Sequence, residues 1–207
     1  MARPRSVGFD LQREQMLAAA AQLFATRGYT ATTMQQVATA CGVSKATLYH
    51  YVSDKHGLLA RIACDHVARL EGLALQVQAR QLPPRDHLEQ LILSFMHAYA
   101  SAAHQHRVLT EDVKFLAEDD QRAVLCGQRR VVAAFAAAIA AVRPGLQGRR
   151  LDKPLAMLLF GMINWTFTWL RASGPLTHAS LAPLVVELFL GGLQALQLPR
   201  RTSTTAA

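Results

Sequence analysis

The sequence predicts an all-α protein of about nine helices, short ones near the N-terminus and longer ones after it. Alanine and leucine dominate the chain, and the alternation of β-branched and polar residues that is typical of strands is nearly absent. Apolar residues recur at helical spacing, as in the stripe of Met16, Ala20, Leu23 and Phe24. Proline and glycine separate these stretches and predict where one helix ends and the next begins.

The first helices are short and have recognisable ends. A helix is expected over residues 10–27, and Gly28 follows it where a left-handed cap belongs. The next begins after Thr33, which has the spacing to Gln36 of a capping box. It ends at Gly42, because only glycine readily adopts the positive φ of a sharp turn.

A third helix is expected over residues 45–51, and a fourth starts near residue 54. Ser44 is the expected cap of the third helix and Ser53 that of the fourth, since hydroxyls satisfy free backbone N–H groups. The two short helices around the glycine turn fit a helix-turn-helix, whose second helix lies in the DNA major groove.

The rest of the chain forms the body of the protein, and prolines and glycines divide it. The fourth helix should end at the proline pair 83–84. Further helices are expected over residues 85–104, briefly within 107–120, up to 142, over 152–171 and over 178–196, with a loop at 145–150. The polar tail after residue 197 should be frayed.

The composition is that of a globular protein with an anionic partner. Hydrophobic residues make up 51% of the chain, charged residues 17%, and the net charge of +8 with a pI near 10.0 favours nucleic acid or phosphate-bearing ligands. Three cysteines without CxxC spacing indicate reduced thiols. Residues 154–170 are uncharged but short for a membrane span and contain an asparagine. We expect a soluble, cytoplasmic protein with no membrane segment and no cofactor.

Residues 42–55, "GVSKATLYHYVSDK", carry many hydrogen-bonding groups on little apolar surface. Val43 and Leu48 can dock the helix, while its outer face offers hydroxyl, ammonium and imidazole groups that reach phosphate oxygens. Simpler roles remain open: the serines as caps only, the tyrosines packed on the first helix, and the lysines as solvated charges.

The stretch "TTMQQVATACGVSKATLYHYVSDKHGLL", residues 32–59, with "AAAAQLFATRGYTATT" before it, resembles the DNA-binding domain of the tetracycline-repressor (TetR) family. The resemblance implies an all-helical homodimer with a three-helix DNA-binding head and a larger ligand-binding body. It implies that a small ligand releases the DNA. The expected organisation is a basic arm at 1–9, a helix-turn-helix domain at 10–70 and a ligand-binding and dimerisation domain at 71–207.

The resemblance also assigns roles to individual positions of the head. Lys45, Ala46 and Thr47 match base-facing positions, and Val52 departs from the usual phenylalanine. The full expected DNA-binding set is Thr33, Gln35, Ser44, Lys45, Ala46, Thr47, Tyr49, His50, Tyr51 and Lys55.

The last helix is apolar on nearly all faces, so a monomer would expose a large patch. Pairing the helices over residues 152–171 and 178–196 with those of a second copy would bury it. Two-fold symmetry then implies a pseudo-palindromic operator, with one half-site for each head.

Aromatic and polar residues in the body suggest a ligand pocket. Asn164 stands in an apolar helix, where a buried amide needs a partner. The candidate ligand-binding residues are Phe95, Tyr99, Phe115, Phe160, Asn164, Trp165 and Thr168; core packing is the alternative for the aromatic ones. The stretch "FGMINWTFTW" resembles a helix of regulators that respond to acyl-CoA thioesters. Five basic residues could bind the CoA phosphates or could simply be solvated: Arg107, Arg129, Arg130, Arg149 and Arg150.

The function expected from these features is a sequence-specific repressor that leaves its operator when a small molecule binds. An acyl-CoA and an aromatic or lipophilic acid are the candidate ligands. An activator of the same family, a non-specific chromosomal DNA-binding protein and a helical enzyme acting on acyl thioesters are the alternatives. A metal site at His104 and His106 is disfavoured, because side chains two apart on a helix diverge.

Overall fold

The computed structural model describes residues 7–171 and 174–197, and these residues form helices and connecting turns without a strand. The all-α class is therefore confirmed. The helices are α1 (Val7–Arg27), α2 (Met34–Ala40), α3 (Lys45–Tyr51), α4 (Lys55–Ala79), α5 (Pro84–Ser101), α6 (Ala103–Glu111), α7 (Glu118–Val142), α8 (Asp152–Asn164), α9 (Thr166–Trp169) and α10 (His178–Ala195). Two 3-10 turns, η1 (Val113–Phe115) and η2 (Pro144–Arg149), connect them.

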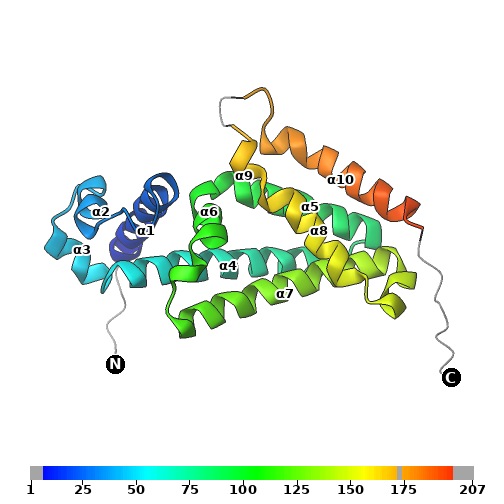
Figure 1. The fold of residues 1–207 in the computed structure, drawn as a ribbon, viewed down its shortest axis with the longest axis horizontal. Coiled ribbons are helices and arrows are strands. Elements are labelled where there is room, and N and C mark those ends of the chain that lie inside the picture. Colours follow the sequence, from blue (N-terminus) through cyan, green and yellow to red (C-terminus); the bar gives the residue numbers. More distant parts are fainter. Residues whose placement is uncertain (1–6, 172–173, 198–207) are drawn as a thin grey trace, which may run out of the picture.

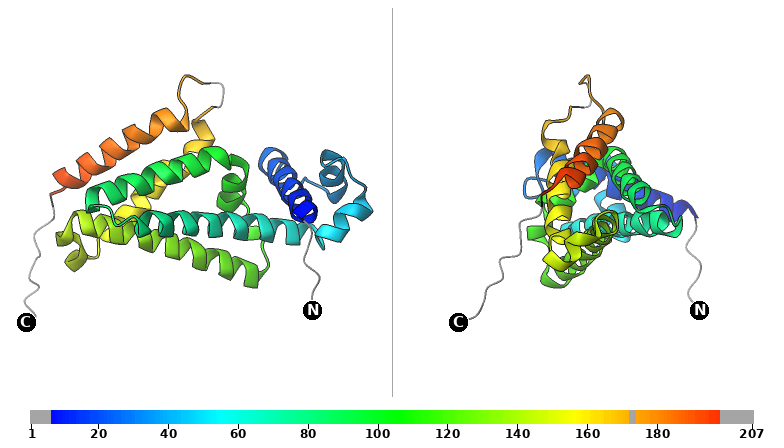
Figure 2. Two further views of the ribbon diagram at one scale, coloured as in Figure 1. Left: turned by 180° about the vertical axis from the view of Figure 1, so that it is seen from behind. Right: turned by 90° about the vertical axis from the view of Figure 1, so that its right-hand side faces the viewer.

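Helices α1, α2 and α3 form a head at one end of the molecule, and α4 runs from it along the whole body (Figure 1). Helix α7 lies beside α4, and α6 stands between the head and the body. Helix α10 packs on α5 at the outside of the body, as both views in Figure 2 show. Helices therefore cover the interior of the body, and α10 forms a layer outside α5.

Local sequence features of the head form as predicted. The backbone N–H of Thr33 donates to Gln36 Oε1 at 2.8 Å, and the Gln36 N–H donates to Thr33 Oγ1 at 3.3 Å, which completes the capping box. Gly42 has φ +67°, so the α2–α3 turn needs glycine's freedom. Ser44 caps α3 by accepting the Thr47 N–H at 3.0 Å.

One predicted cap is wrong. Asp54, and not Ser53, caps α4, because its carboxylate accepts the Gly57 N–H at 2.7 Å. An aspartate adds charge to the same hydrogen bond at the positive end of the helix. The predicted arm at 1–9 is also shortened, since residues 7–9 belong to α1 and residues 1–6 lie outside the described residues, as does the tail from 198.

Two helix boundaries in the body differ from the prediction. The helix expected over 85–104 ends at Ser101, and α6 starts at Ala103, after a break at Ala102 with φ −134° and ψ 42°. The helix expected over 152–171 is divided at Trp165. There the Thr166 hydroxyl donates to the Ile163 carbonyl at 2.8 Å, a side-chain bond that competes with the helical ladder.

Helices α4 and α7 approach closely at Gly127. A Cβ on Gly127 would collide with Glu71 and would lie 3.1 Å from two methyl groups of Val67. Arg130 of α7 holds the same Glu71 with two N–H groups, at 2.8 and 3.0 Å. This close contact forms one wall of the body's interior.

Helices α7 and α10 are long and apolar enough to cross a membrane by length and composition alone, a test that core helices of soluble proteins also pass. Helix α7 packs against α4, α5 and α8. Helix α10 buries one side, mainly on α5, and its other side leaves apolar residues exposed to solvent.

Candidate nucleic-acid interface and ligand cavity

The outer surface of α3 offers an accessible row of polar side chains. Leu48 is fully buried and docks the helix on the head, as predicted. Of the ten expected DNA-binding residues, seven are exposed: Thr33, Gln35, Ser44, Lys45, Ala46, Tyr49 and His50. Thr47 is half-buried, and its hydroxyl shares a 2.8 Å hydrogen bond with that of Ser44. The surface has the size and chemistry of a helix that enters a groove.

The two tyrosines of α3 differ in their surroundings. Tyr51 donates its hydroxyl to Gln12 Oε1 at 2.7 Å and stacks on Phe9 with ring centroids 4.4 Å apart. It therefore packs on α1, the alternative that the sequence left open. Tyr49 is exposed, with the Lys45 ammonium 5.9 Å from its ring centre. Of the two, Tyr49 is free to reach a phosphate.

Lys55 points into the protein. Its ammonium donates to the carbonyls of Tyr29 and Thr32 at 2.9 Å and of Thr30 at 3.3 Å, and it lies 4.4 Å from the Tyr29 ring centre. All three N–H groups are thus used to tie the α1–α2 connection to the start of α4. A phosphate contact by Lys55 stays a prediction and would require these bonds to break.

A cavity of about 170 Å³ lies in the body among α4, α5, α6, α7 and α8. Three of the candidate ligand residues line it: Tyr99, Phe160 and Asn164. The Tyr99 hydroxyl donates to Asn164 Oδ1 at 2.8 Å, so α5 supplies a partner for the amide in the apolar helix. Burial raises the pKa of Tyr99, which keeps its hydroxyl protonated.

The other four candidates do not line this cavity. Phe95 is fully buried and meets Phe135 edge-on at 4.8 Å between centroids, which is core packing. Phe115 lies at the head–body junction, stacked on Tyr29 at 5.2 Å. Trp165 and Thr168 are exposed, because the break after α8 turns this segment outward.

The sequence singles out His106 of α6 only as a disfavoured metal ligand and does not indicate its contact with the buried His66 of α4. Of these two histidines, only His106 lines the cavity. Their rings meet with Nε2 of His66 3.5 Å from Nδ1 of His106, and His106 also stacks on Tyr99 at 3.6 Å. Burial lowers the pKa of His66 to about 4; burial, followed by the nearby His66, lowers that of His106 to about 3. Both imidazoles are therefore neutral at physiological pH. A separation of 40 residues hides this contact from any local pattern.

A wider groove of about 620 Å³ adjoins the cavity, and the two share Gln128, Val132 and Met157. Arg129 and Lys153 stand on this groove and give it cationic groups, with Asp152 nearby. The other basic candidates are placed differently. Arg107 pairs with Glu111, Arg130 pairs with Glu71, Arg150 is exposed, and the side chain of Arg149 lies outside the described residues.

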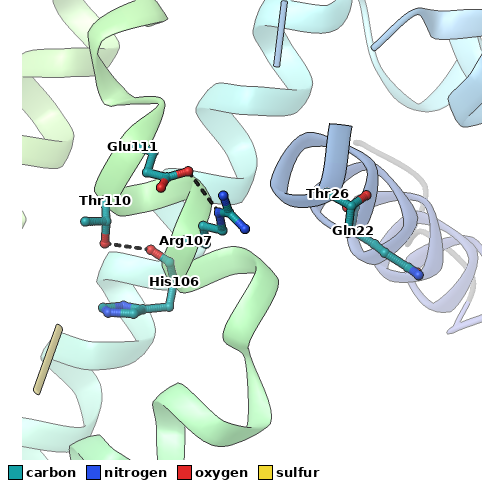
Figure 3. A network of polar contacts seen from close by, with 6 residues as sticks. All are labelled: Gln22, Thr26, His106, Arg107, Thr110 and Glu111. Carbon is teal, nitrogen blue, oxygen red and sulfur yellow. Dashed lines mark hydrogen bonds and ion pairs between the residues drawn. The ribbon is translucent and has the colours of Figure 1, made fainter. Parts of the chain in front are cut away.

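Helix α6 has one face toward the head and another toward the cavity. Figure 3 shows Arg107 and Glu111 on the side near α1, and the His106 ring pointing to the opposite side. Helix α1 packs more extensively against α6 than against α4. The same short helix therefore contacts both candidate sites.

The exposed side of α10 and of the α8–α9 segment is apolar. Large hydrophobic side chains are exposed there: Leu158, Trp165, Trp169, Leu184 and Leu188. An apolar groove of about 360 Å³ runs between α8 and α10. Such a patch is typical of a surface that another protein covers. Within the described residues no three His, Cys, Asp or Glu side chains are grouped as a metal site.

Comparisons with known proteins agree with this arrangement. Residues 16–62 match the family model for bacterial regulatory proteins of the tetR family, and residues 81–193 match that for a tetracyclin repressor-like C-terminal domain. The HTH-type transcriptional repressor KstR2 from Rhodococcus jostii is 26% identical over 185 residues, covering 88% of this chain and 91% of the relative.

Solved structures show the same fold. A TetR-family transcriptional regulator from Bordetella parapertussis has a TM-score of 0.83 and 34% identity, over 90% of this chain and 98% of that one. AibR, solved in complex with isovaleryl coenzyme A and operator DNA, has a TM-score of 0.73 and 23% identity, over 86% of this chain and 97% of AibR. The likeness to AibR concerns the fold alone.

Proposed function

The chain belongs to the tetR family of bacterial regulatory proteins and is a DNA-binding transcriptional regulator, and on this premise we propose that it is a repressor released from its operator by a small molecule. The observation that carries the proposal is α6, which contacts α1 of the head and lines the cavity of the body. A ligand that moves α6 changes the position of the head. Coupling of this kind is a difference in free energy between the DNA-fitting and the non-fitting arrangement.

In the proposed complex the exposed end of α3 reads the DNA. Lys45, Ala46 and Thr47 approach base edges, and the exposed Tyr49 and His50 bind phosphates. The remaining members of the set, Thr33, Gln35, Ser44, Tyr51 and Lys55, act at the phosphate backbone or support α3. The protein works in the cytoplasm, where its DNA lies.

The active form is a homodimer through α8–α9 and α10. The exposed apolar side chains and the groove between these helices support this surface, since a second copy would remove them from water. A two-fold dimer places two heads on one face of the DNA and requires a pseudo-palindromic operator. An activator role through the same dimer is the alternative, and run-off transcription with purified RNA polymerase distinguishes the two.

The ligand is an acyl-CoA. The cavity takes the acyl group, and the adjoining groove takes the anionic part, with Arg129 and Lys153 as phosphate partners. AibR, of the same fold, binds isovaleryl coenzyme A. An aromatic or lipophilic acid would use the cavity alone and would leave the cationic groove without a role.

The test measures binding of the full-length protein to its own upstream DNA and to a shuffled duplex at physiological salt. A specific regulator should prefer its operator by about 10³-fold or more. Equal affinity for both duplexes, with a steep salt dependence, would instead indicate a non-specific chromosomal protein. A panel of acyl-CoAs is then added to the operator complex, and the proposal requires at least one to release the DNA.

A further inference from the structure

The two ends of the cavity differ in chemistry. Gln128 and Met157 lie at the end shared with the cationic groove, whereas Tyr99, His106 and Asn164 form the other end. Met157 and Asn164 are seven residues apart on α8, a rise of about 10 Å. Apolar side chains such as Val131 and Phe160 lie along the cavity. A ligand entering from the groove therefore meets an apolar passage and then a polar end.

That polar end contains an unused hydrogen-bonding atom. His106 is 3% exposed, and its Nε2 is the one fully buried side-chain nitrogen or oxygen among the described residues that has no hydrogen-bond partner in good geometry. The Asn164 backbone also acts on this ring as an acceptor and opposes the lowering of its pKa by burial. A buried polar atom without a partner costs about 1–3 kcal/mol, so such atoms mark places where a ligand or water belongs. The other ring nitrogen, Nδ1, faces His66 at 3.5 Å. Because one nitrogen of a neutral imidazole donates and the other accepts, His66 sets the role of Nε2.

The cavity is also uncharged. No Lys, Arg, Asp or Glu lines it, and burial holds His106 in its neutral form. A carboxylate at the polar end would be desolvated, which is strongly unfavourable without a counter-charge in the cavity. The cation beside this end, Arg171, is exposed and lines a neighbouring groove that shares Tyr99 and His106. A carbonyl or hydroxyl oxygen fits, since one hydrogen bond with Nε2 satisfies both partners.

We propose that the ligand carries an uncharged oxygen, a carbonyl or a hydroxyl, at its buried end, and that Nε2 of His106 reads this oxygen while His66 positions the ring. The inference rests on the proposed function and deepens it, because it specifies the acyl group as oxo- or hydroxy-substituted. A cavity of about 150 Å³ holds benzene, so the 170 Å³ here suits a ring or short chain of about six to eight heavy atoms.

Phenol, toluene and benzoate test the proposal. Phenol and toluene have the same shape and differ only in the oxygen, and benzoate brings a charge. Their dissociation constants are measured by ligand-observed NMR on full-length wild type and on His106→Phe, which keeps the aromatic stack on Tyr99. The ratio of phenol to toluene affinity should fall by about threefold to tenfold in the variant, the size of one net hydrogen bond. His104→Phe, at an exposed histidine of the same helix, is the matched control and should leave the ratio unchanged.

A second readout needs no variant at position 106. In protein labelled with ¹⁵N-histidine, phenol should shift the Nε2 resonance of His106 and toluene should not. His66→Phe should move the two ring-nitrogen shifts of His106 toward values averaged over both tautomers, which a purely structural role would not do.

Three outcomes would overturn the proposal: an unchanged ratio in His106→Phe, no response of Nε2 to phenol, or benzoate displacing phenol at equal concentration. None of these measurements contains DNA. Their failure would therefore leave operator binding intact, whereas a failure to prefer the operator would not affect phenol binding.

Discussion

The head and the body of this protein carry their candidate sites in opposite ways. In the head, most polar groups of α3 lie on the surface, and Ser44 holds Thr47 from three residues away; Tyr51, which bonds to Gln12 of α1, is the exception. In the body, the polar groups are buried and are held by residues 40 or 65 positions away, as in His66–His106 and Tyr99–Asn164. The head site is therefore a product of local structure, and the body site exists only in the complete fold.

This difference predicts what substitutions do. Changes on α3 should alter DNA binding with little effect on stability, because the side chains are exposed. Changes around His106 should alter ligand binding and stability together, because the side chains belong to the core.

The outer face of α10 is an exception to the contrast between head and body, because it is an exposed site in the body. Leu188 of α10 is 68% exposed, and Leu188→Lys places a charge in each half of the proposed dimer surface. We expect monomers in sedimentation velocity and a loss of operator affinity of about 10²–10⁴-fold, since the two half-sites are no longer bound together. Leu75→Lys on α4, where Leu75 is 64% exposed, is the control and should stay dimeric. Dimeric Leu188→Lys protein with full affinity would place the interface elsewhere.

The buried histidines of the body should make the stability of the protein depend on pH. The folded protein keeps His66 and His106 neutral, with pKa values of about 4 and 3, while the unfolded chain protonates them near 6.5. The unfolded state thus binds more protons below pH 6.5, so stability falls as the pH falls. Each imidazole should cost about 2 kcal/mol between pH 7 and pH 5, measured as the free energy of urea unfolding.

Variants assign this pH dependence. His66→Phe and His106→Phe should each flatten it. Asp112 acts in the opposite direction. Burial, helped by Glu111, raises the pKa of Asp112 to about 6. Its contribution to the stability of the fold is therefore present at low pH and is lost as the pH rises from about 4 to 6. Asp112→Asn should therefore make the acid loss steeper.

The third prediction separates two roles on α3. Thr47→Ala should weaken operator binding by about 1–3 kcal/mol and relax the base preference at one position. Tyr49→Phe should weaken binding to all duplexes alike, because a phosphate contact carries no sequence information. Both are measured by anisotropy on a panel of operator variants. A uniform loss for Thr47→Ala would remove its base-reading role.

The smallest effect concerns the local structure of the head. Thr33→Ala removes the capping box of α2 and should lower stability by about 1 kcal/mol, measured by thermal unfolding. Thr39→Ala, on the same helix, is the control. The Thr39 hydroxyl bonds back to the Gln35 carbonyl, a contact that does not stabilise a helix, so stability should be unchanged or slightly higher.

The parts of the molecule that could be predicted from the sequence are those set by short spacing. The α2 capping box, the Gly42 turn and the bounds of α3 needed only a few neighbouring residues. The choice of cap for α4 failed because Ser53 and Asp54 are both good capping residues, and spacing alone does not rank them. The break at Trp165 was not predicted, because helix propensity does not include the hydrogen bonds that two threonine hydroxyls donate to backbone carbonyls there.

The candidate cavity could be predicted only in part. Asn164 was identified because an amide in an apolar helix is unusual, and its partner Tyr99 because it is aromatic. His106 had no such signal. It sits two residues from the exposed His104, and the packing of α4 and α5 against its ring distinguishes the two.

The two faces of α6 have a consequence for evolution and for engineering. On the proposed function, a substitution on α6 alters effector recognition and head position at once, so selection for a new effector there would also disturb the DNA response. Val131, Val132 and Phe160 line the cavity from α7 and α8, which are not among the helices that pack on the head. Libraries at these three positions offer the route to a biosensor with a new effector range that still switches transcription.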